Sequence, residues 1–313
     1  MDLDLRLVRY FVTVGEELHF GRAAAKLFLL QPALSKQIRK REAQLGVQLL
    51  VRNSRHVGLT ARGERLLDEG RALLQLAERI QHPPDPDVLR LAHVYELATS
   101  RVLADAYARA HPAVTLVERQ LDSYGQLQSL LAGRLDVAVL RVTAHMRAEH
   151  PTGWQHRPLR LEPMHLVGRP GDPERPTASL HERPIEVFGD TPEFHLHNAH
   201  GDYLRAFERH TGLAMRWLGN PGTLNHCLAA VRRATRPAFV LEFASYAVGY
   251  AAAGLPVHRP AELQPYYPWS IAWRAEPPGA ALADLLDVAE QTAEDHGWLT
   301  PDPGAPAWVP ELR

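Results

Sequence analysis

Hydroxyl and cationic side chains recur at helical spacing between residues 31 and 40, where they could bind a polyanion. Ser35, Lys36, Arg39 and Lys40 fall on one side of a helix, and the apolar residues between them fall on the other. Such a polar face offers the donors with which DNA-binding helices contact base edges and phosphates. The sequence therefore predicts a recognition helix at this position.

The neighbouring residues indicate which elements hold this helix. Pro32 suits a first helical turn, and Gly46 suits a left-handed helix end. We expect two helices before it, over 5–18 and from Gly21, and two short strands after it, over 47–51 and 57–60, joined by a basic loop. The residues predicted to contact DNA are Arg22, Gln31, Pro32, Ala33, Ser35, Lys36, Arg39, Lys40, Arg52 and Arg55.

The charge distribution supports a DNA-binding block at the N-terminus. Residues 1–60 hold ten Lys and Arg against five Asp and Glu, a net charge of +5, which leaves −6 for the rest of the chain. All three lysines lie in this block. A basic module on an acidic body is typical of a nucleic-acid-binding domain joined to another domain.

A long amphipathic helix is predicted over 61–81, with Thr60 as its N-terminal cap. Its apolar stripe must be buried, and the same helix of a second subunit would bury it in a symmetric pair. Packing against its own chain is the alternative. The predicted dimerisation residues are Leu66, Leu67, Leu73, Leu74 and Ile80.

From residue 88 onwards, short apolar runs alternate with helical patterns, as in a parallel α/β sheet. The runs 88–94, 114–119 and 135–141 are predicted strands. A single cysteine, Cys227, fits a reducing cytoplasm, and the apolar residues around it predict a buried structural thiol. No apolar run approaches the ~20 residues that a membrane span requires, so we expect a cytoplasmic protein with no membrane partner.

Two parts of the chain resemble the LysR-type transcriptional regulators. RYFVTVGEELHFGRAAAKL, QPALSKQIRKREAQLGVQLL and LTARGERLL resemble that family's winged helix-turn-helix over about the first 75 residues. ARAHPAVTLVERQ and LLAGRLDVAVLR resemble its effector-binding half. Three features depart from the family pattern: the apolar pair Leu29-Leu30 before Gln31, Arg41 at a usually apolar core position, and the segment 232–242.

The resemblance implies an α/β multidomain architecture. It consists of a winged helix-turn-helix (1–60), a linker helix and hinge (61–87), and a two-lobed effector domain with the fold of type 2 periplasmic binding proteins. Lobe I would span 88–161 with 268–313, and lobe II would span 162–267. The chain would cross between the lobes near 161–164 and 263–269.

The resemblance also implies a DNA-binding regulator that forms a homodimer and then a homotetramer on double-stranded promoter DNA and communicates with RNA polymerase. In this fold, a small-molecule effector, often an anionic metabolite, binds where helices begin near the carboxyl ends of strands. These helix starts could equally be ordinary caps. The candidate effector-binding residues are Thr99, Ser100, Ser123, Asn198, Asp202 and Thr223.

Other chemistries have weaker support in the sequence. His195, His197 and His200 approximate a binuclear metallohydrolase motif, but Ala199 occupies the position of a metal-binding carboxylate. We therefore expect no metal, no cofactor and no enzyme activity. The alternative function is a metabolite-binding or metal-responsive protein in which the two-lobed domain carries the main activity.

Overall fold

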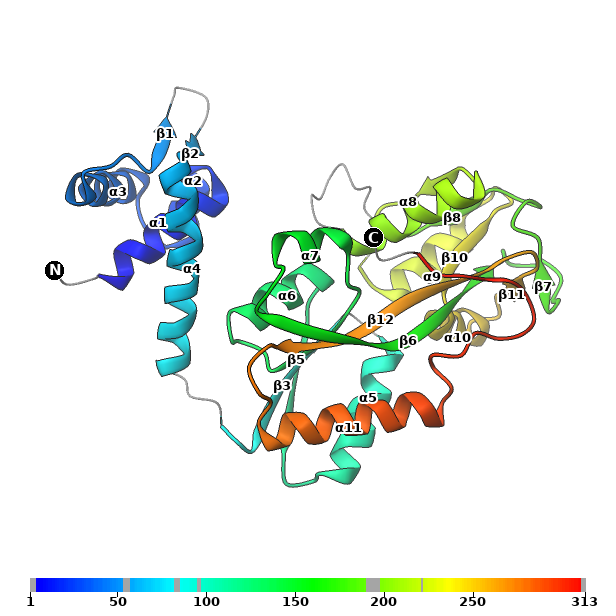
Figure 1. The fold of residues 1–313 in the computed structure, drawn as a ribbon. Coiled ribbons are helices and arrows are strands. Elements are labelled where there is room, and N and C mark those ends of the chain that lie inside the picture. The colour runs from blue at the N-terminus through cyan, green and yellow to red at the C-terminus, as the bar shows by residue number, and fades with distance from the viewer. Residues whose placement is uncertain are drawn as a thin grey trace. The chain divides into compact units, whose positions relative to one another are not determined.

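The computed structural model describes residues 4–52, 57–81, 85–94, 97–189, 198–220 and 222–310. The chain forms two compact units, Met1–Pro84 and Asp85–Arg313 (Figure 1). Unit 1 contains the residues predicted to contact DNA, and unit 2 contains the alternating strands and helices predicted from residue 88 onwards. The predicted boundary between residues 60 and 61 does not separate compact units, because the linker helix belongs to unit 1.

Unit 1 is a helical bundle with a two-stranded antiparallel hairpin. Its elements are α1 (Leu5–Glu17), α2 (Phe20–Lys26), α3 (Gln31–Leu45), β1 (Leu50–Arg52), β2 (Val57–Leu59) and α4 (Ala61–Gln81). As predicted, Gly46 ends α3 in the left-handed region, with a φ angle of 65°. The Gly63 amide donates to the Thr60 hydroxyl oxygen at 3.0 Å, so Thr60 caps α4.

The core of unit 1 fixes the orientation of α3. Phe11, Leu34 and Ile38 are almost completely buried, so α3 turns its apolar face toward α1 and α2. Glu42 accepts hydrogen bonds from the amides of Leu49 and Leu50, at 2.9 and 3.1 Å, which joins the end of α3 to β1. The opposite face of α3 is therefore held in a fixed direction.

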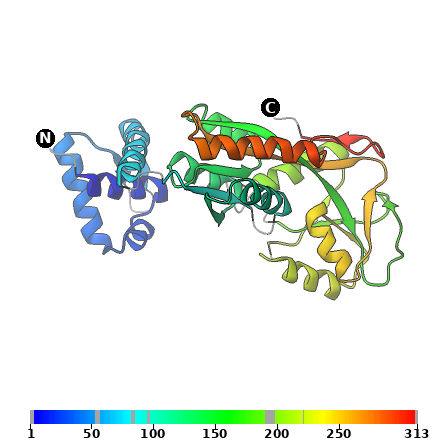
Figure 2. The same cartoon turned by 90° about the horizontal axis from the view of Figure 1, so that it is seen from below.

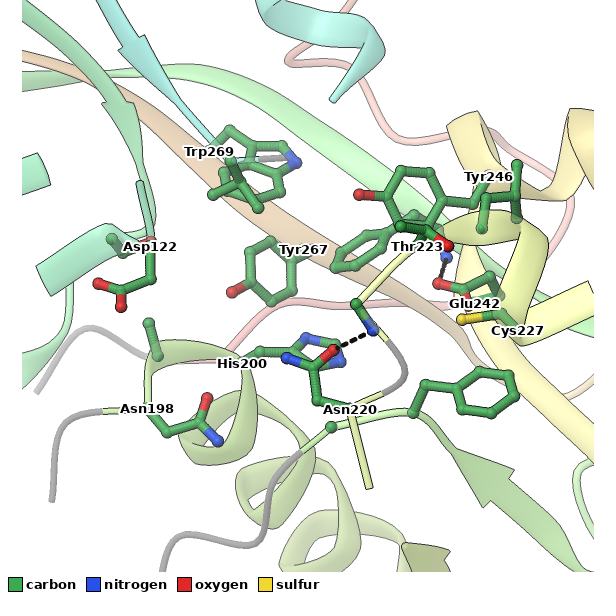
Figure 3. A pocket seen from close by; sticks show the side chains of 18 of the residues that line it. Asp122, Asn198, His200, Asn220, Thr223, Cys227, Glu242, Tyr246, Tyr267 and Trp269 are labelled. Atoms are coloured by element: carbon green, nitrogen blue, oxygen red, sulfur yellow. Dashed lines mark hydrogen bonds between the residues drawn. The ribbon is translucent and has the colours of Figure 1, made fainter. Parts of the chain in front are cut away.

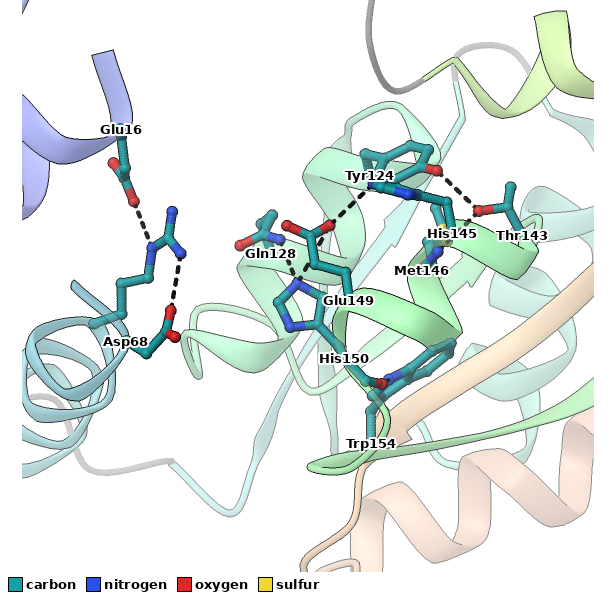
Figure 4. Close-up of polar contacts among 11 residues, drawn as sticks. Glu16, Asp68, Tyr124, Gln128, Thr143, His145, Met146, Glu149, His150 and Trp154 are labelled. Atoms are coloured by element: carbon teal, nitrogen blue, oxygen red, sulfur yellow. Dashed lines mark hydrogen bonds and ion pairs between the residues drawn. The ribbon is translucent and has the colours of Figure 1, made fainter. Parts of the chain in front are cut away.

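Helix α4 packs closely on its own domain, which was the alternative to the predicted packing of its apolar stripe against a second subunit. A Cβ atom at Gly63 would lie 2.1 Å from the Leu49 carbonyl oxygen, and one at Gly70 would lie 2.9 Å from Val12. Leu67 is only 7% exposed within the same core. An ion pair between Arg71 and Glu16 adds a polar contact to α1 (Figure 4). The missing side chains at two glycines allow this close approach.

Unit 2 contains two α/β lobes. Its first half comprises β3 (Val88–His93), α5 (Ala98–Ala110), β4 (Thr115–Gln120), α6 (Ser123–Leu131), β5 (Val137–Leu140), α7 (Ala144–Glu149), β6 (Trp154–Val167), β7 (Thr177–Ala178) and β8 (Ile185–Val187). Its second half comprises α8 (Ala199–Thr211), β9 (Met215–Trp217), α9 (Leu224–Arg233), β10 (Phe239–Phe243), α10 (Ala244–Ala252), β11 (Val257–Pro260), β12 (Gln264–Arg274), α11 (Ala280–Asp295) and β13 (Ala307–Trp308).

The sheet runs in the order β4-β3-β5-β12-β6-β10-β8-β9. Strand β5 (VAVL) is buried on both faces: Val137 and Val139 face α5 and α11, whereas Ala138 and Leu140 face α6 (Figures 1 and 2). A strand that is buried on both faces has a continuous run of apolar residues. This run is the pattern from which the sequence predicted strand β5.

The two longest strands connect the lobes. Strand β6 pairs with β12 over residues 154–163 and with β10 over residues 164–167. The predicted crossings near 161–164 and 263–269 fall on these two strands. The segment 232–242, which departs from the family pattern, still leads into a regular strand, β10, between β6 and β8.

One boundary prediction is wrong at the end of the chain. Residues 268–313 were assigned to lobe I, but β13 pairs with the start of β12 in lobe II. Trp308 packs against Tyr203 and Phe207 of α8, with ring centroids 5.3 and 4.9 Å apart. The aromatic side chain is buried only by this return to lobe II. Among the described residues, no helix is long and apolar enough to cross a membrane.

Candidate nucleic-acid interface and ligand cavity

The outer face of α3 is exposed and cationic, as the sequence predicts. Gln31, Pro32, Ala33, Lys36, Arg39 and Lys40 are exposed, and Ser35 is half-buried. Within the described residues, no ion pair involves Lys36, Arg39 or Lys40. These three charges therefore remain available for phosphates. Arg41 is half-buried on the side of the helix that approaches the core.

The predicted contact residue Arg22 is held by an acid of its own domain. Its guanidinium Nε lies 3.0 Å from Glu17, which also pairs with Lys26. Hydrogen bonds from Lys26 and Arg22 lower the pKa of Glu17 below its ordinary value. Arg22 is still exposed, but its charge is partly neutralised. The side chain of Arg52 and all of Arg55 lie outside the described residues.

The turn before α3 exposes two large apolar side chains. Phe28 is 96% exposed and Leu30 is 77% exposed, on either side of the half-buried Leu29. Phe28 has a φ angle of 55°, in the left-handed region that large side chains rarely adopt. The sequence prediction noted Leu29-Leu30 as unusual but missed Phe28. A turn without any polar residue was the sequence feature that could have predicted exposed apolar side chains here.

Unit 2 contains a cavity of about 390 Å³ at the carboxyl ends of strands from both lobes (Figure 3). Parallel-sheet proteins commonly bind small ligands at this position. One wall comes from the start of α6, a second from the starts of α8, α9 and α10, and a third from β12. The residues lining it are Val94, Asp122, Ser123, Tyr124, Phe188, Gly189, Asn198, Ala199, His200, Asn220, Gly222, Thr223, Leu224, Cys227, Glu242, Phe243, Tyr246, Tyr267 and Trp269.

The structure places three of the six candidate effector-binding residues in this lining. Ser123, Asn198 and Thr223 line the cavity, whereas Asp202 does not. Thr99 and Ser100 do not line it either, because both are completely buried inside α5. The expectation that these two residues cap α5 is wrong. The Thr99 hydroxyl accepts from Arg160 at 2.9 Å, and the Ser100 hydroxyl donates to the Leu97 carbonyl.

The helices that begin at the cavity are capped by side chains of the protein. Asp122 accepts from the Gly125 amide at 2.6 Å, and Asn198 accepts from the Gly201 amide at 2.9 Å. Thr223 accepts from the His226 amide at 3.3 Å, as predicted. These caps occupy backbone donors that a ligand anion would otherwise use.

Two buried carboxylates lie at the start of α10. Glu242 accepts from the Phe243 amide at 3.1 Å and from the Tyr250 hydroxyl at 3.4 Å. Glu162, on β6, accepts from the Ser245 amide at 3.1 Å and from the indole of Trp269 at 2.6 Å. Burial raises the pKa of Glu242 to about 7, and the nearby charge of Glu162 adds to this rise. Sequence reasoning missed both acids, because each sits within an apolar run.

Aromatic rings form much of the cavity wall. Phe243 contacts the rings of Tyr246, Tyr267 and Trp269, with centroids 5.6, 5.0 and 5.9 Å away. The Tyr124 hydroxyl is hydrogen-bonded to Thr143 at 2.9 Å, which fixes that ring at the opposite wall (Figure 4).

Two lining residues have properties that the sequence did not indicate. Burial lowers the pKa of His200 to about 4, helped by the charge of Arg141, so the imidazole is neutral near pH 7. Cys227 was predicted to be a buried structural thiol, but it is half-buried and lines the cavity. Its side chain packs against the hydrophobic cluster that includes Val231 and Tyr250 and also reaches the edge of the cavity.

The metal hypothesis gains no support from the described residues. Among them, no group of three or more His, Cys, Asp or Glu side chains could hold a metal ion. His200 lies beside the rings of Phe243 and Tyr267, at centroid distances of 5.2 and 5.7 Å. His195 and His197 lie outside the described part of the chain.

Comparison with known proteins finds a family match within unit 1 and solved structures that align with both units. Residues 5–64 match the family described as "Bacterial regulatory helix-turn-helix protein, lysR family". The chain is 36% identical over 198 residues to the uncharacterised HTH-type transcriptional regulator YnfL of Escherichia coli (strain K12). It is 37% identical over 196 residues to the HTH-type transcriptional regulator XapR of the same organism.

The aligned regions cover 60% of this chain and 66% and 64% of the two relatives, which is slightly less than two thirds of their lengths. Among solved structures, CbnR, a LysR family transcriptional regulator, aligns with 93% of this chain and 99% of its own. The TM-score is 0.56 at 22% identity, so this likeness shows the fold alone. It covers both the helix-turn-helix unit and the two-lobed unit.

The pKa of Glu242 predicts a pH-dependent effect of Glu242→Gln on stability. Because the pKa in the folded protein is about 7 and the ordinary value is 4.5, the folded state binds this proton more tightly. Glu242 therefore destabilises the fold progressively as pH rises from about 4.5 to about 7. The variant should gain stability over wild type through this window, reaching about 3 kcal/mol at the upper end.

Urea unfolding of unit 2, followed by tryptophan fluorescence at several pH values, measures this difference. Asp105→Asn removes an exposed carboxylate from α5 and serves as the control. A Glu242→Gln effect that is constant with pH, or equal to that of the control, would contradict the assignment.

Proposed function

We propose that the chain belongs to the LysR family of bacterial regulatory helix-turn-helix proteins and that it is a transcription regulator that binds promoter DNA under the control of a small-molecule effector. The observation that carries this proposal is the cationic face of α3, where Lys36, Arg39 and Lys40 are exposed and have no acidic partner among the described residues.

The geometry of unit 1 supports insertion of α3 into a major groove. The apolar side of α3 is fixed in the core by Leu34 and Ile38, so its polar face must point outward. Lys36, Arg39 and Lys40 would contact phosphates or base edges, with Ser35 and the start of the helix close to the bases. Arg52, the last residue of β1, and Arg55, three residues later in the sequence, would add contacts to the DNA phosphate backbone.

We propose that α4 joins two subunits through the part of its surface that unit 1 leaves uncovered. Leu66, Leu73 and Ile80 are spaced seven residues apart, which places them on one stripe of the helix. Ile80 is 72% exposed, and the neighbouring Leu76 is 45% exposed. Leu66 and Leu73 retain partial exposure, as does Leu74. Leu67 would contribute to the dimer only by supporting the domain core.

A dimer would place two α3 helices on a pseudo-palindromic site, and pairs of dimers would form the tetramer. Binding of an effector in the cavity would favour one arrangement of the lobes over another and so bias the placement of the subunits on DNA. A change in DNA bending or in contact with RNA polymerase would then alter transcription. In this proposal the protein is cytoplasmic, requires no cofactor and catalyses no reaction.

Removing a cation from α3 should weaken DNA binding. In fluorescence anisotropy with DNA from upstream of its own gene, Arg39→Ala should lose about 5- to 150-fold in affinity, the range of ~1–3 kcal/mol for one base contact. Arg109→Ala, an exposed arginine at the end of α5, is the matched control and should bind normally. Repeating the titration over a salt series should give a steep loss of affinity with salt.

Equal losses for Arg39→Ala and Arg109→Ala would refute the α3 interface. A complete lack of sequence-preferring binding by wild type at low salt would refute the regulator itself. It would favour the alternative of a metabolite-binding protein whose main activity resides in the two-lobed unit.

Charges on the exposed stripe of α4 should disrupt the dimer. The double variant Leu73→Glu/Ile80→Glu would bury two carboxylates between subunits, so sedimentation velocity should show a shift toward monomer. Glu64→Lys, which changes an exposed charge roughly 160° around the helix from Leu66 and Ile80, should leave the association state unchanged. A double variant that sediments like wild type would show that this stripe is not the dimer interface.

A further inference from the structure

The proposed effector cavity has the chemistry of a site for a positively charged ligand. We propose that its effector is a small organic amine, whose ammonium group lies beside Glu242 and the aromatic rings of Phe243 and Tyr246 and whose apolar body fills the remaining space. This inference rests on the proposed effector-controlled function and gives the ligand class of that site. It differs from the anionic metabolite that the sequence resemblance implied.

The first support is the charge of the lining. Asp122 and Glu242 line the cavity, and no Lys or Arg is among the described lining residues. The undescribed segments that adjoin lining residues in sequence, 95–96, 190–197 and 221, contain no Lys or Arg either. His200 is neutral near pH 7, since burial lowers its pKa to about 4.

The second support is that helix N-termini at the cavity already bind oxygens of the protein. Asp122, Asn198 and Thr223 cap α6, α8 and α9. Glu242 and Glu162 accept from amides at the start of α10. An anionic ligand would have to compete with these acceptors and approach Glu242, whereas a cation would be attracted to the same carboxylates.

The third support is the aromatic wall around the acid. Phe243 follows Glu242 directly, and its ring meets those of Tyr246 and Tyr267 at 5.6 and 5.0 Å. Aromatic faces attract ammonium groups, and the attraction grows when water is excluded. The indole N–H group of Trp269 already donates to Glu162, so it is not available to an anionic ligand.

Arg141 is the buried cation that could oppose this assignment. Its charge acts on His200 and Tyr267, but its side chain does not line the cavity. One guanidinium nitrogen donates to the Ala199 carbonyl at 2.6 Å, and the group lies 5.7 Å from the ring centre of Tyr267. Arg141 therefore binds the start of α8 to lobe I instead of presenting its charge to the ligand.

Cys227 provides a direct test, because it lines the cavity and is the single cysteine of the chain. The full-length protein is treated with N-ethylmaleimide, with 2-phenylethylamine, 2-phenylethanol or phenylacetate as protectant at up to about 10 mM. These compounds share an apolar body and differ in charge. The ammonium compound should slow alkylation of Cys227, and its affinity should exceed that of phenylacetate by about tenfold or more.

The carboxylate of Glu242 should set the pH dependence of this protection. Its surroundings include Glu162 from β6, Tyr250 from α10 and Cys227 from α9. Protection, measured as the ratio of rates with and without amine, should strengthen as pH rises from about 6 to about 8, because the ionised acid binds the cation. Glu242→Gln should weaken protection and remove this dependence, and Asp105→Asn should leave both unchanged.

Equal or better protection by phenylacetate would overturn the proposal and would assign charge recognition to Arg141. Absence of protection by the amine over the whole concentration range would overturn it as well. DNA binding by the ligand-free protein is measured separately. Failure of the regulatory function would therefore appear in that assay and not in the alkylation rates.

An independent observation in unit 1 concerns how DNA sequence would be read. Phe28 and Leu30 project from a turn whose backbone is fixed by hydrogen bonds from the amides of Phe28 and Leu29 to α2, at 3.2 and 2.9 Å. Cations lie on both sides of this turn, at Lys26 and Lys36. We infer that these apolar side chains contact thymine methyl groups in the major groove, beside the start of α3.

Replacing single thymines by deoxyuridine removes only the methyl group and so isolates this contact. In a duplex selected from a random library by the full-length protein, one or two such replacements per half-site should weaken binding about fourfold, the value of one buried methyl. Phe28→Asn and Leu30→Ser, which suit the left-handed and helix-capping positions, should lose this methyl dependence.

Methyl dependence that is absent in wild type, or unchanged in both variants, would overturn this second inference. A change in association state without a change in methyl dependence would do the same and would assign the apolar pair to a protein contact. Failure of the proposed DNA-binding function would be recognised by the absence of any selected duplex.

Discussion

The antiparallel pairing of β6 with β12 is the constraint on which unit 2 depends. These strands continue from the sheet of lobe I into that of lobe II. On β6, Glu162 accepts hydrogen bonds from the indole of Trp269 on β12 and from the Ser245 amide in α10, so it connects both strands to the cavity wall. A completely buried carboxylate is costly unless its hydrogen bonds are satisfied, so Glu162 fixes the positions of both donors. The cavity walls are thus built on the same two strands that join the lobes.

The two units use charge in opposite ways. In unit 1, Lys36, Arg39 and Lys40 of α3 have no acidic partner within the described part of the chain, and their exposed surface suits the extended charge of DNA. Unit 2 places acids at helix starts, where they satisfy backbone donors, and two of them, Asp122 and Glu242, line the cavity. The separation of +5 and −6 seen in the sequence therefore corresponds to the two proposed binding surfaces, which differ in chemistry.

Local patterns in the sequence predicted the elements well, because caps and periodicity are determined by neighbouring residues. Thr60, Gly46 and the span of α4 from Ala61 to Gln81 agree with the structure. Contacts between segments that are distant in the sequence could not be predicted from these local patterns. Leu67 lies in the core of unit 1 because Gly63 and Gly70 allow α4 to approach its own domain closely. Thr99 and Ser100 are completely buried because their side of α5 packs against the rest of unit 2. Glu242 could not be recognised as a cavity residue until β10 was placed beside β6.

The close contacts at Gly63 and Gly70 give α4 a mechanical property. A helix of 21 residues is about 30 Å long, and its first half is packed against the domain that carries α3. It therefore acts as a rigid lever instead of a flexible tether. A tilt of about 10° at one end displaces the other by about 5 Å, more than the ~3.4 Å rise of one base pair along DNA. In the proposed dimer, small rotations of the subunits would be amplified into shifts of position along the DNA.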